Sequence, residues 1–171
     1  MTYANTWMSW LLLAVSLNAG AVLGAAAKPQ DFVAQAGAAG LYEVNSAELA
    51  RDRTQDAQVR AFADQMFAHH SAANRELNSL ANQHELMAPT EIDPKHQQLL
   101  DRLGKLEGRD FDREYAQQQL QTHQAAVTLF EEQAKSGTDD ELRQWASQKV
   151  PILKAHLEHA QKLAAGDETQ R

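Results

Sequence analysis

Long segments in which apolar residues recur every three or four positions constrain this chain more than any other feature. That period is typical of an α-helix with one buried face. Four such segments run over residues 31–53, 56–86 and 108–136 and from residue 138 onward. Ala, Gln, Leu and Glu are abundant and only four prolines occur in 171 residues, so the composition also favours an all-α chain.

The connections between these segments predict the topology. Only about three residues separate the first two segments, and about three separate the last two, so each pair is predicted to form an antiparallel hairpin. Between the hairpins lie residues 87–107, which include Pro89, Pro94 and a short amphipathic stretch at 95–106. A link of that length can cross the whole bundle. We therefore predict a ferritin-like four-helix bundle, in which a long crossover carrying a short helix joins two antiparallel hairpins.

The first residues of the chain have the pattern of an export signal. Residues 1–27 contain no charged side chain and combine an apolar stretch with small residues that end at Ala27. This pattern is typical of a secretory signal peptide cleaved after Ala27, and we expect a periplasmic protein. The alternative is an uncleaved membrane anchor through residues 7–27, which are just long enough to span a bilayer. The predicted organisation is a signal peptide at 1–27, a four-helix bundle domain at 28–166 and a disordered tail at 167–171.

Composition and motifs exclude several classes of function. Without cysteine, the chain has no disulfide, no thiolate zinc site and no cysteine nucleophile. The formal net charge of −7 argues against a nucleic-acid partner. The sequence also lacks a glycine-rich phosphate loop and a Gly-x-Ser-x-Gly nucleophile motif. We therefore expect a non-enzymatic binding or envelope-protective protein, with peripheral envelope association left open and no particular protein partner favoured.

Polar residues fall on the inner stripe of each long segment, near or somewhat past its middle. They are Glu43, His70, His123 and His156. In an antiparallel bundle such residues can meet in one layer, where three imidazoles and a carboxylate can bind a single Zn²⁺, Fe²⁺, Mn²⁺ or Cu²⁺ ion. His159, one turn beyond His156, can join or replace it. No glutamate is followed by a histidine three positions later, so a ferritin-type di-iron centre is not expected.

Two alternatives need no metal cofactor. The histidines can form a structural polar layer, satisfied by hydrogen bonds to Glu43, Tyr115 or Gln119. They can also make the bundle pH-responsive, because buried neutral imidazoles gain a proton at about pH 6. His69 precedes His70 by one position and so points about 100° away on the helix, which predicts a solvent-facing side chain.

An internal repeat links the second and third long segments. The pattern from Phe62 to Ala73 recurs from Tyr115 to Ala126 in the same register, with a histidine at the equivalent position of each copy. Motifs from all four segments can be compared with known protein families. The motifs that matter for that comparison are Phe32-Val33-x-x-Ala36-x-x-Ala39-Gly40-Leu41-x-Glu43-Val44, Phe62-Ala63-x-x-Met66-x-x-x-His70-x-x-Ala73-Asn74-x-x-Leu77, Asp112-x-x-Tyr115, His123-x-x-Ala126-Val127-x-Leu129-Phe130-Glu131 and Pro151-x-Leu153-x-x-His156-Leu157.

These motifs resemble the domain-of-unknown-function 4142 family of exported bacterial proteins, often called predicted outer membrane proteins. The resemblance covers about residues 31–163. It implies a ferritin-like four-helix bundle and carries no established activity. The chain departs from the family pattern at His69 and Thr122, where the family tends to have aspartate before the histidine.

Overall fold

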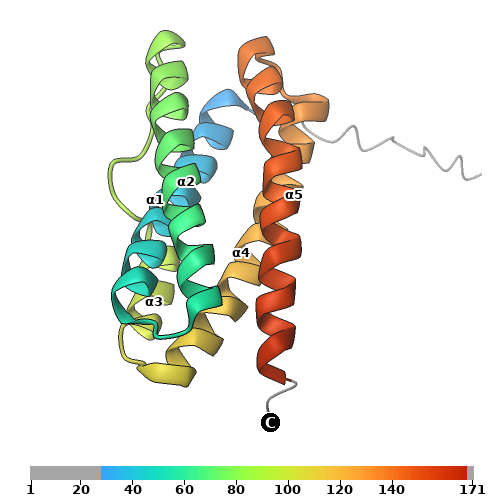
Figure 1. Cartoon of the computed structure of the whole chain (residues 1–171). Coiled ribbons are helices and arrows are strands. Elements are labelled where there is room, and N and C mark those ends of the chain that lie inside the picture. Colours follow the sequence, from blue (N-terminus) through green and yellow to red (C-terminus); the bar gives the residue numbers. More distant parts are fainter. Residues whose placement is uncertain (1–27, 169–171) are drawn as a thin grey trace, which may run out of the picture.

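The fold is built from five helices (Figure 1). It was obtained as a computed structural model, which describes residues 28–168, and the regular secondary structure of that range is entirely α-helical. The expected signal peptide, the alternative membrane anchor and residues 169–171 of the expected tail lie outside the described residues. The helices are α1 (Pro29–Arg53), α2 (Ala57–Gln83), α3 (Pro94–Leu103), α4 (Gly108–Ser136) and α5 (Asp140–Glu168).

The four long helices form two antiparallel hairpins. In Figure 1, α1 descends and α2 returns beside it, while α4 ascends and α5 descends beside it. The crossover runs back along the bundle between α2 and α4, and its short helix α3 packs against α1 and α4. The predicted fold class is therefore confirmed. The last helix, α5, extends to Glu168, two residues into the segment that was expected to form the tail.

Short polar side chains set several of the helix starts. Asp56 caps α2, because its carboxylate accepts hydrogen bonds from the backbone N–H groups of Gln58 and Val59 at 2.7 and 3.1 Å. Asp93 caps α3 in the same way, with the backbone N–H of His96 at 2.9 Å. Both caps lie in connections, so they fix where the chain turns back into the bundle.

The start of α5 is capped by Asp139 and contacts the end of α2. The carboxylate of Asp139 accepts a hydrogen bond from the backbone N–H of Leu142 at 2.8 Å. The Glu141 carboxylate lies 2.9 Å from His84 Nε2 at the end of α2. The same histidine contacts Asp139 through Nδ1 at 2.8 Å, so it joins the two hairpins at this end.

Two apolar clusters fill the bundle, one toward each end. The Phe32 cluster comprises Phe32, Val33, Ala36, Leu77, Ala81, Phe130, Leu142, Trp145, Ala146 and Leu153. The Phe62 cluster comprises Ala47, Ala50, Val59, Phe62, Ala63, Met66, Leu103, Phe111, Tyr115 and Ala160. On every long helix, at least one buried polar residue falls between the positions that contribute to the two clusters. The core is thus divided by a polar layer.

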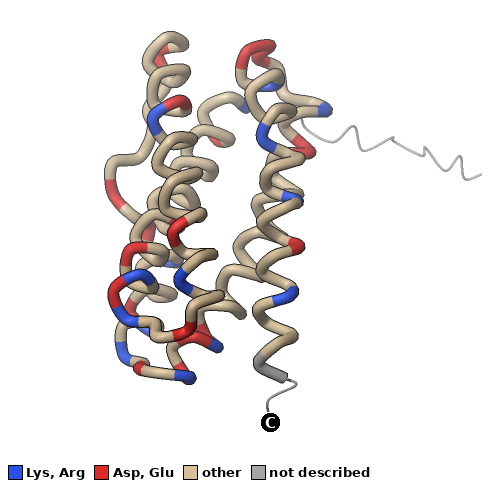
Figure 2. The backbone as a smooth tube through the Cα atoms, in the orientation of Figure 1, with Lys and Arg blue, Asp and Glu red and all other residues tan. Residues whose placement is uncertain are grey.

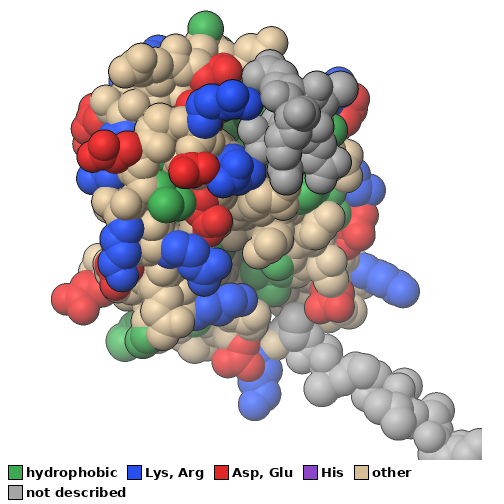
Figure 3. Space-filling view, turned by 90° about the horizontal axis from the view of Figure 1, so that it is seen from below, with side chains coloured by type: hydrophobic (Ala, Val, Ile, Leu, Met, Phe, Trp, Pro, Cys, Tyr) green, Lys and Arg blue, Asp and Glu red, His purple; other side chains and the backbone are tan. Residues whose placement is uncertain are grey.

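Charged side chains of both signs are distributed over the surface. Acidic and basic residues are interspersed along the helices and the connections (Figure 2). The view from below likewise shows Lys and Arg side chains close to Asp and Glu (Figure 3). None of the described helices combines the length and the apolar character that a membrane span requires.

Candidate metal centre

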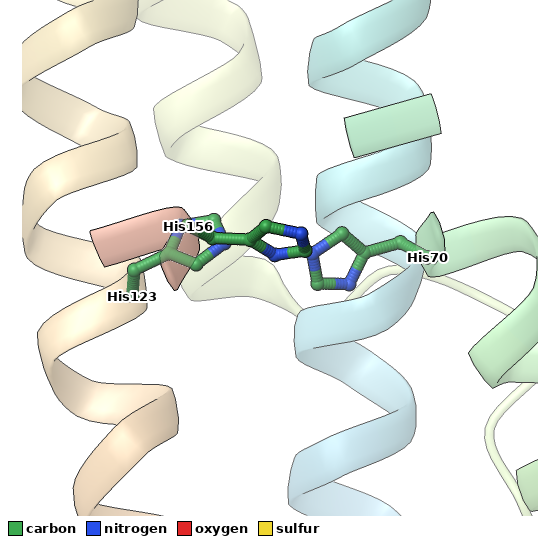
Figure 4. A group of neighbouring side chains, drawn as sticks. All are labelled: His70, His123 and His156. Atoms are coloured by element: carbon green, nitrogen blue, oxygen red, sulfur yellow. The ribbon is translucent and has the colours of Figure 1, made fainter. Parts of the chain in front are cut away.

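Three histidines from three helices meet in the polar layer. His70 comes from α2, His123 from α4 and His156 from α5, and their rings converge between the helices (Figure 4). One ring nitrogen of each lies within 4.8 Å of those of the other two. The ring centroids form a nearly equilateral triangle with sides of 5.4–5.5 Å. We call these three residues the histidine triad.

The position of the triad follows from helix geometry. His70 lies one turn after Met66 of the Phe62 cluster and two turns before Leu77 of the Phe32 cluster. Residues spaced by three or four positions share a helix face, so the imidazole points into the bundle between apolar layers. His123 is at the equivalent position of the repeat. The exposed fractions of His70, His123 and His156 are 9%, 1% and 2%.

The orientation of the His123 ring is fixed by its own helix. Its Nδ1 lies 2.9 Å from the backbone carbonyl oxygen of Gln119, one turn earlier. A carbonyl oxygen can only accept, so Nδ1 carries the ring proton and Nε2 is left with a free lone pair. Among the described residues, this buried Nε2 has no hydrogen-bond partner. The same is true of Nε2 of His70 and Nδ1 of His156.

His69 reaches the triad from the surface of α2. Its Nδ1 lies 2.8 Å from His156 Nε2, and the two rings stack with centroids 5.0 Å apart. The side chain belongs to an exposed residue, as its position beside His70 predicted, but sequence reasoning missed this contact. When His156 Nε2 is the donor and His69 Nδ1 the acceptor, Nδ1 of His156 has a free lone pair in the layer.

Burial favours the uncharged form of His70 and His156. The pKa of His70 is lowered well below its usual value, first by burial and then by the neighbouring imidazoles of His123 and His156. The pKa of His156 is lowered to about 3, again first by burial and then by His123 and His69. Neutral imidazoles have the lone pairs that metal ions bind, so the electrostatics of the layer suit ligation.

The fourth predicted ligand, Glu43, lies beside the triad. Its carboxylate is buried and accepts hydrogen bonds from Gln119 Nε2 at 2.8 Å and from Thr122 Oγ1 at 2.7 Å. Its nearer oxygen is 3.8 Å from His123 Nδ1, the nitrogen that already donates to Gln119. The structure therefore puts Glu43 behind His123, and within residues 28–168 the group of converging ligand atoms consists of the triad alone.

His159, the other candidate, packs against the aromatic core. Its ring meets the ring of Phe62 edge to face, with the centroids 4.9 Å apart. It also contributes to lowering the pKa of His156. It is not part of the converging group.

The donor set of the triad fits a transition-metal ion. Three ring nitrogens that have no partner among the described residues would each gain a bond on ligation. Two imidazole nitrogens held by one ion at about 2.0 Å lie roughly 3.3 Å apart, so ligation would draw the rings inward. The hydrogen bond from His123 Nδ1 to a carbonyl is the outer contact that metal-bound histidines use.

Together, the fold and the triad define a helical bundle with a candidate metal site in its core. A family model described as "Domain of unknown function (DUF4142)" matches residues 15–163, so the chain belongs to this family. The resemblance noted from the sequence motifs is thereby confirmed. A comparison with curated proteins found no match.

Solved structures with the same fold include a metal-bound protein. CopM in its Cu(II)-bound form has 16% sequence identity and a TM-score of 0.70, covering 82% of this chain and 98% of that chain. A DUF305 protein from Streptomyces coelicolor, described as a candidate secreted protein, has 16% identity and a TM-score of 0.69, with 80% and 90% covered. A DUF305 fragment from Deinococcus radiodurans has 17% identity and a TM-score of 0.70, with 82% and 97% covered. At these identities the similarity establishes the shared fold.

Proposed function

We propose that this chain is an exported protein that binds one transition-metal ion through His70, His123 and His156. The observation that carries the proposal is the convergence of three buried imidazoles whose ring nitrogens lie within 4.8 Å of one another. Buried polar atoms in proteins are nearly always hydrogen-bonded. A layer with three ring nitrogens lacking partners among the described residues is better explained by a ligand that they share.

Copper is the ion that we favour. The site offers imidazole nitrogen alone, and among divalent first-row ions such sites bind Cu²⁺ most tightly. Carboxylate ligands, which manganese prefers, are not in the converging group, because the Glu43 oxygens bind Gln119 and Thr122. The copper-bound and silver-bound structures of CopM support this choice through the shared fold. Zinc, which takes three histidines and a water in other proteins, is the second candidate.

The role that we propose is binding rather than catalysis. An ion held between the two apolar clusters is shielded from solvent, which suits storage or sequestration in the cell envelope. The apolar segment at residues 1–27 and the likeness to a candidate secreted protein support an extracytoplasmic location. This role is a specific form of the binding or envelope-protective function expected from the sequence.

Metal content tests the proposal directly. The chain is purified without a histidine tag, exposed to Cu²⁺, Zn²⁺ or Fe²⁺, desalted and analysed for bound metal. We expect about one copper ion per chain, and loss of binding in His70→Ala, His123→Ala and His156→Ala. The matched control is His84→Ala, which removes a histidine that contacts Asp139 and Glu141 far from the triad. Less than about 0.1 ion per chain with every metal would overturn the proposal.

A further inference from the structure

The free ring nitrogens of the histidine triad are all buried. They are His70 Nε2, His123 Nε2 and His156 Nδ1, and none has a polar partner among the described residues. An ion in solution meets none of them while the rings keep these positions. If the triad binds metal, one of its rings therefore has to turn toward the solvent to receive the ion. Rotation of a side chain about its own bonds is the smallest motion that can do so.

His156 is the triad ring whose position depends on a group at the surface. Its Nε2 lies 2.8 Å from Nδ1 of His69, an exposed residue of α2. His123, by contrast, is held from within its own helix by the backbone carbonyl oxygen of Gln119. Within residues 28–168, no other hydrogen bond joins a ring nitrogen of the triad to an exposed side chain. His69 and His156 therefore form the link between the solvent and the buried site.

The proton in this contact lies on His156 Nε2. A proton on Nδ1 of His156 would instead leave a buried N–H group without a partner, which is costly. His69 Nδ1 therefore accepts the hydrogen bond, and its lone pair can bind a metal ion once the bond opens. Binding of an ion to His69 removes the outer contact of His156 and frees that ring to turn. Nδ1 of both residues already has a lone pair, so no proton has to leave.

A cavity connects exposed side chains at the contact between α2 and α5 with the triad. Its volume is about 230 Å³, and its lining includes the whole triad together with the exposed residues His69, Glu76 and Ile152. The helices α2 and α5 belong to different hairpins and pack against each other (Figure 1). A water molecule takes up about 30 Å³ in the liquid, so the cavity has room for an ion with several of its water ligands. The route from His69 to the triad is therefore wide enough.

The charges along the cavity do not oppose a cation. Lys149 is the basic residue of its wall, and Nζ of this lysine lies 2.5 Å from a Glu76 carboxylate oxygen, so its charge is balanced. The buried carboxylate of Glu43 lines the cavity beside His123. A negative group at the inner end attracts a positive ion, and it does so more strongly than in water because its surroundings have a low dielectric constant.

We propose that His69 is the entry ligand of the metal site. It captures Cu²⁺ at the surface through Nδ1 and passes the ion to Nδ1 of His156, which turns back and brings it to His70 and His123. The ion exchanges a water for His69 and then His69 for the triad nitrogens, and its oxidation state does not change. This inference rests on the proposed metal-binding function and adds the route by which the ion reaches the site.

Stopped-flow mixing of the full chain with Cu²⁺ tests the route. The protein is stripped of metal with a chelator and mixed with Cu²⁺ supplied as a glycine complex, and the absorption of protein-bound copper gives the association rate. Excess chelator then gives the dissociation rate. The decisive variant is His69→Asn, because its side-chain oxygen keeps the hydrogen bond from His156 Nε2 but is a weaker ligand for copper than imidazole. We expect both rates to fall by at least about tenfold with little change in Kd, since an ion leaves by the path through which it enters.

His69→Ala separates an entry ligand from two simpler roles. A ring that only holds His156 in position would act mainly on the dissociation rate, as most changes within one binding site do. A ring that only blocks the cavity would, when removed, let copper bind faster. We expect slower association instead, by at least about tenfold. The matched control is His84→Ala, which removes another histidine at the end of α2 and should associate at the wild-type rate.

The inference is overturned if His69→Asn binds copper as fast as the wild type, or if His69→Ala binds it faster. Bound copper per chain is measured on the same preparations. A wild type that takes up no copper overturns the proposed metal site and this route together. A wild type that takes up about one copper ion at a rate insensitive to His69 overturns the route alone and leaves the metal site intact.

Discussion

The Nδ1 atom of His123 donates its proton to the backbone carbonyl oxygen of Gln119, 2.9 Å away. Both residues lie on α4, one turn apart. The helix that carries His123 therefore also determines which of its two ring nitrogens holds the proton. The Nε2 atom of His123 therefore has a free lone pair before a metal ion binds. Pre-orientation of this kind lowers the cost of binding, because little ring motion has to be frozen.

His69 is expected to support metal binding through His156. The His69→Ala variant lacks the ring that contacts His156 Nε2. This contact holds the His156 proton on Nε2 and so leaves Nδ1 of His156 free to bind metal. We expect a copper affinity lower by roughly 10- to 100-fold with the stoichiometry unchanged, as for other outer contacts of metal ligands. Competition with a chelator of known affinity measures the change.

The matched variant at this position is His69→Asn. The asparagine side-chain oxygen occupies the same place along the side chain as His Nδ1 and can accept the same hydrogen bond. It should recover most of the affinity that His69→Ala loses. Equal affinities for the wild type and His69→Ala would show that the contact plays no part in binding.

Glu43 is expected to contribute to stability rather than to metal binding. Glu43→Ala leaves Gln119 Nε2 and Thr122 Oγ1 without the carboxylate that they bind at 2.8 and 2.7 Å. Gln119 Nε2 keeps Ser46 Oγ at 3.3 Å and Thr122 Oγ1 keeps the Gln118 carbonyl oxygen at 3.0 Å, so the loss is that of hydrogen bonds to a charged group, and the free energy of unfolding should fall by about 1.5–3 kcal/mol. Urea unfolding measures it. Retention of about one copper per chain is expected, and complete loss of copper would identify Glu43 as a ligand.

The sequence predicted the composition of the polar layer better than its contacts. Apolar periodicity alone put Glu43 and three histidines on inner stripes at similar heights, and all four are buried. It could not show that Glu43 would be taken by Gln119 and Thr122, because that depends on the rotation of α1 against α4. His69 was missed for a similar reason, since a residue on the flank of α2 reaches across to α5 only at the observed spacing of these helices.

The topology was easier to predict from the sequence than the positions of the helix ends. Two short connections and one long one allow few arrangements of four amphipathic helices, and the observed hairpins are the predicted ones. The last helix was expected from residue 138 onward and begins at Asp140, with Asp139 as its cap. His84 at the end of α2 contacts both Asp139 and Glu141, and this contact between the hairpins could not be predicted from the local sequence.

Two buried tyrosines should respond oppositely to loss of the hydroxyl. Tyr42 donates to Gln118 Oε1 at 2.8 Å, so Tyr42→Phe should cost about 0.5–1.5 kcal/mol. The buried Tyr115 hydroxyl has no hydrogen-bond partner among the described residues, so Tyr115→Phe should be neutral or should stabilise by up to about 1 kcal/mol. Each variant is the control for the other in urea unfolding. A large loss of stability in Tyr115→Phe would contradict the prediction.

The metal-free protein should lose stability as the pH falls from 7.5 to 5. In the folded state burial lowers the pKa of His156 to about 3, and the pKa of His70 shifts in the same direction, whereas an unfolded histidine has a pKa of about 6.5. Below about pH 6.5 the unfolded chain therefore binds protons that the folded chain does not, so acid favours unfolding. The slope is at most about 1.4 kcal/mol per pH unit for each histidine.

His84 acts in the opposite direction and has to be separated from the triad. Its hydrogen bond to Glu141 raises its pKa, so its contribution is present at low pH and is lost as the pH rises through the folded-state pKa. Urea unfolding of His84→Ala at several pH values removes this contribution, and the decline toward pH 5 should be at least as steep as in the wild type. The double variant His70→Leu/His156→Leu should show a much flatter profile. A free energy of unfolding that stays constant from pH 8 to 5 in metal-free wild-type protein and in His84→Ala would mean that these imidazoles are not buried in the neutral form.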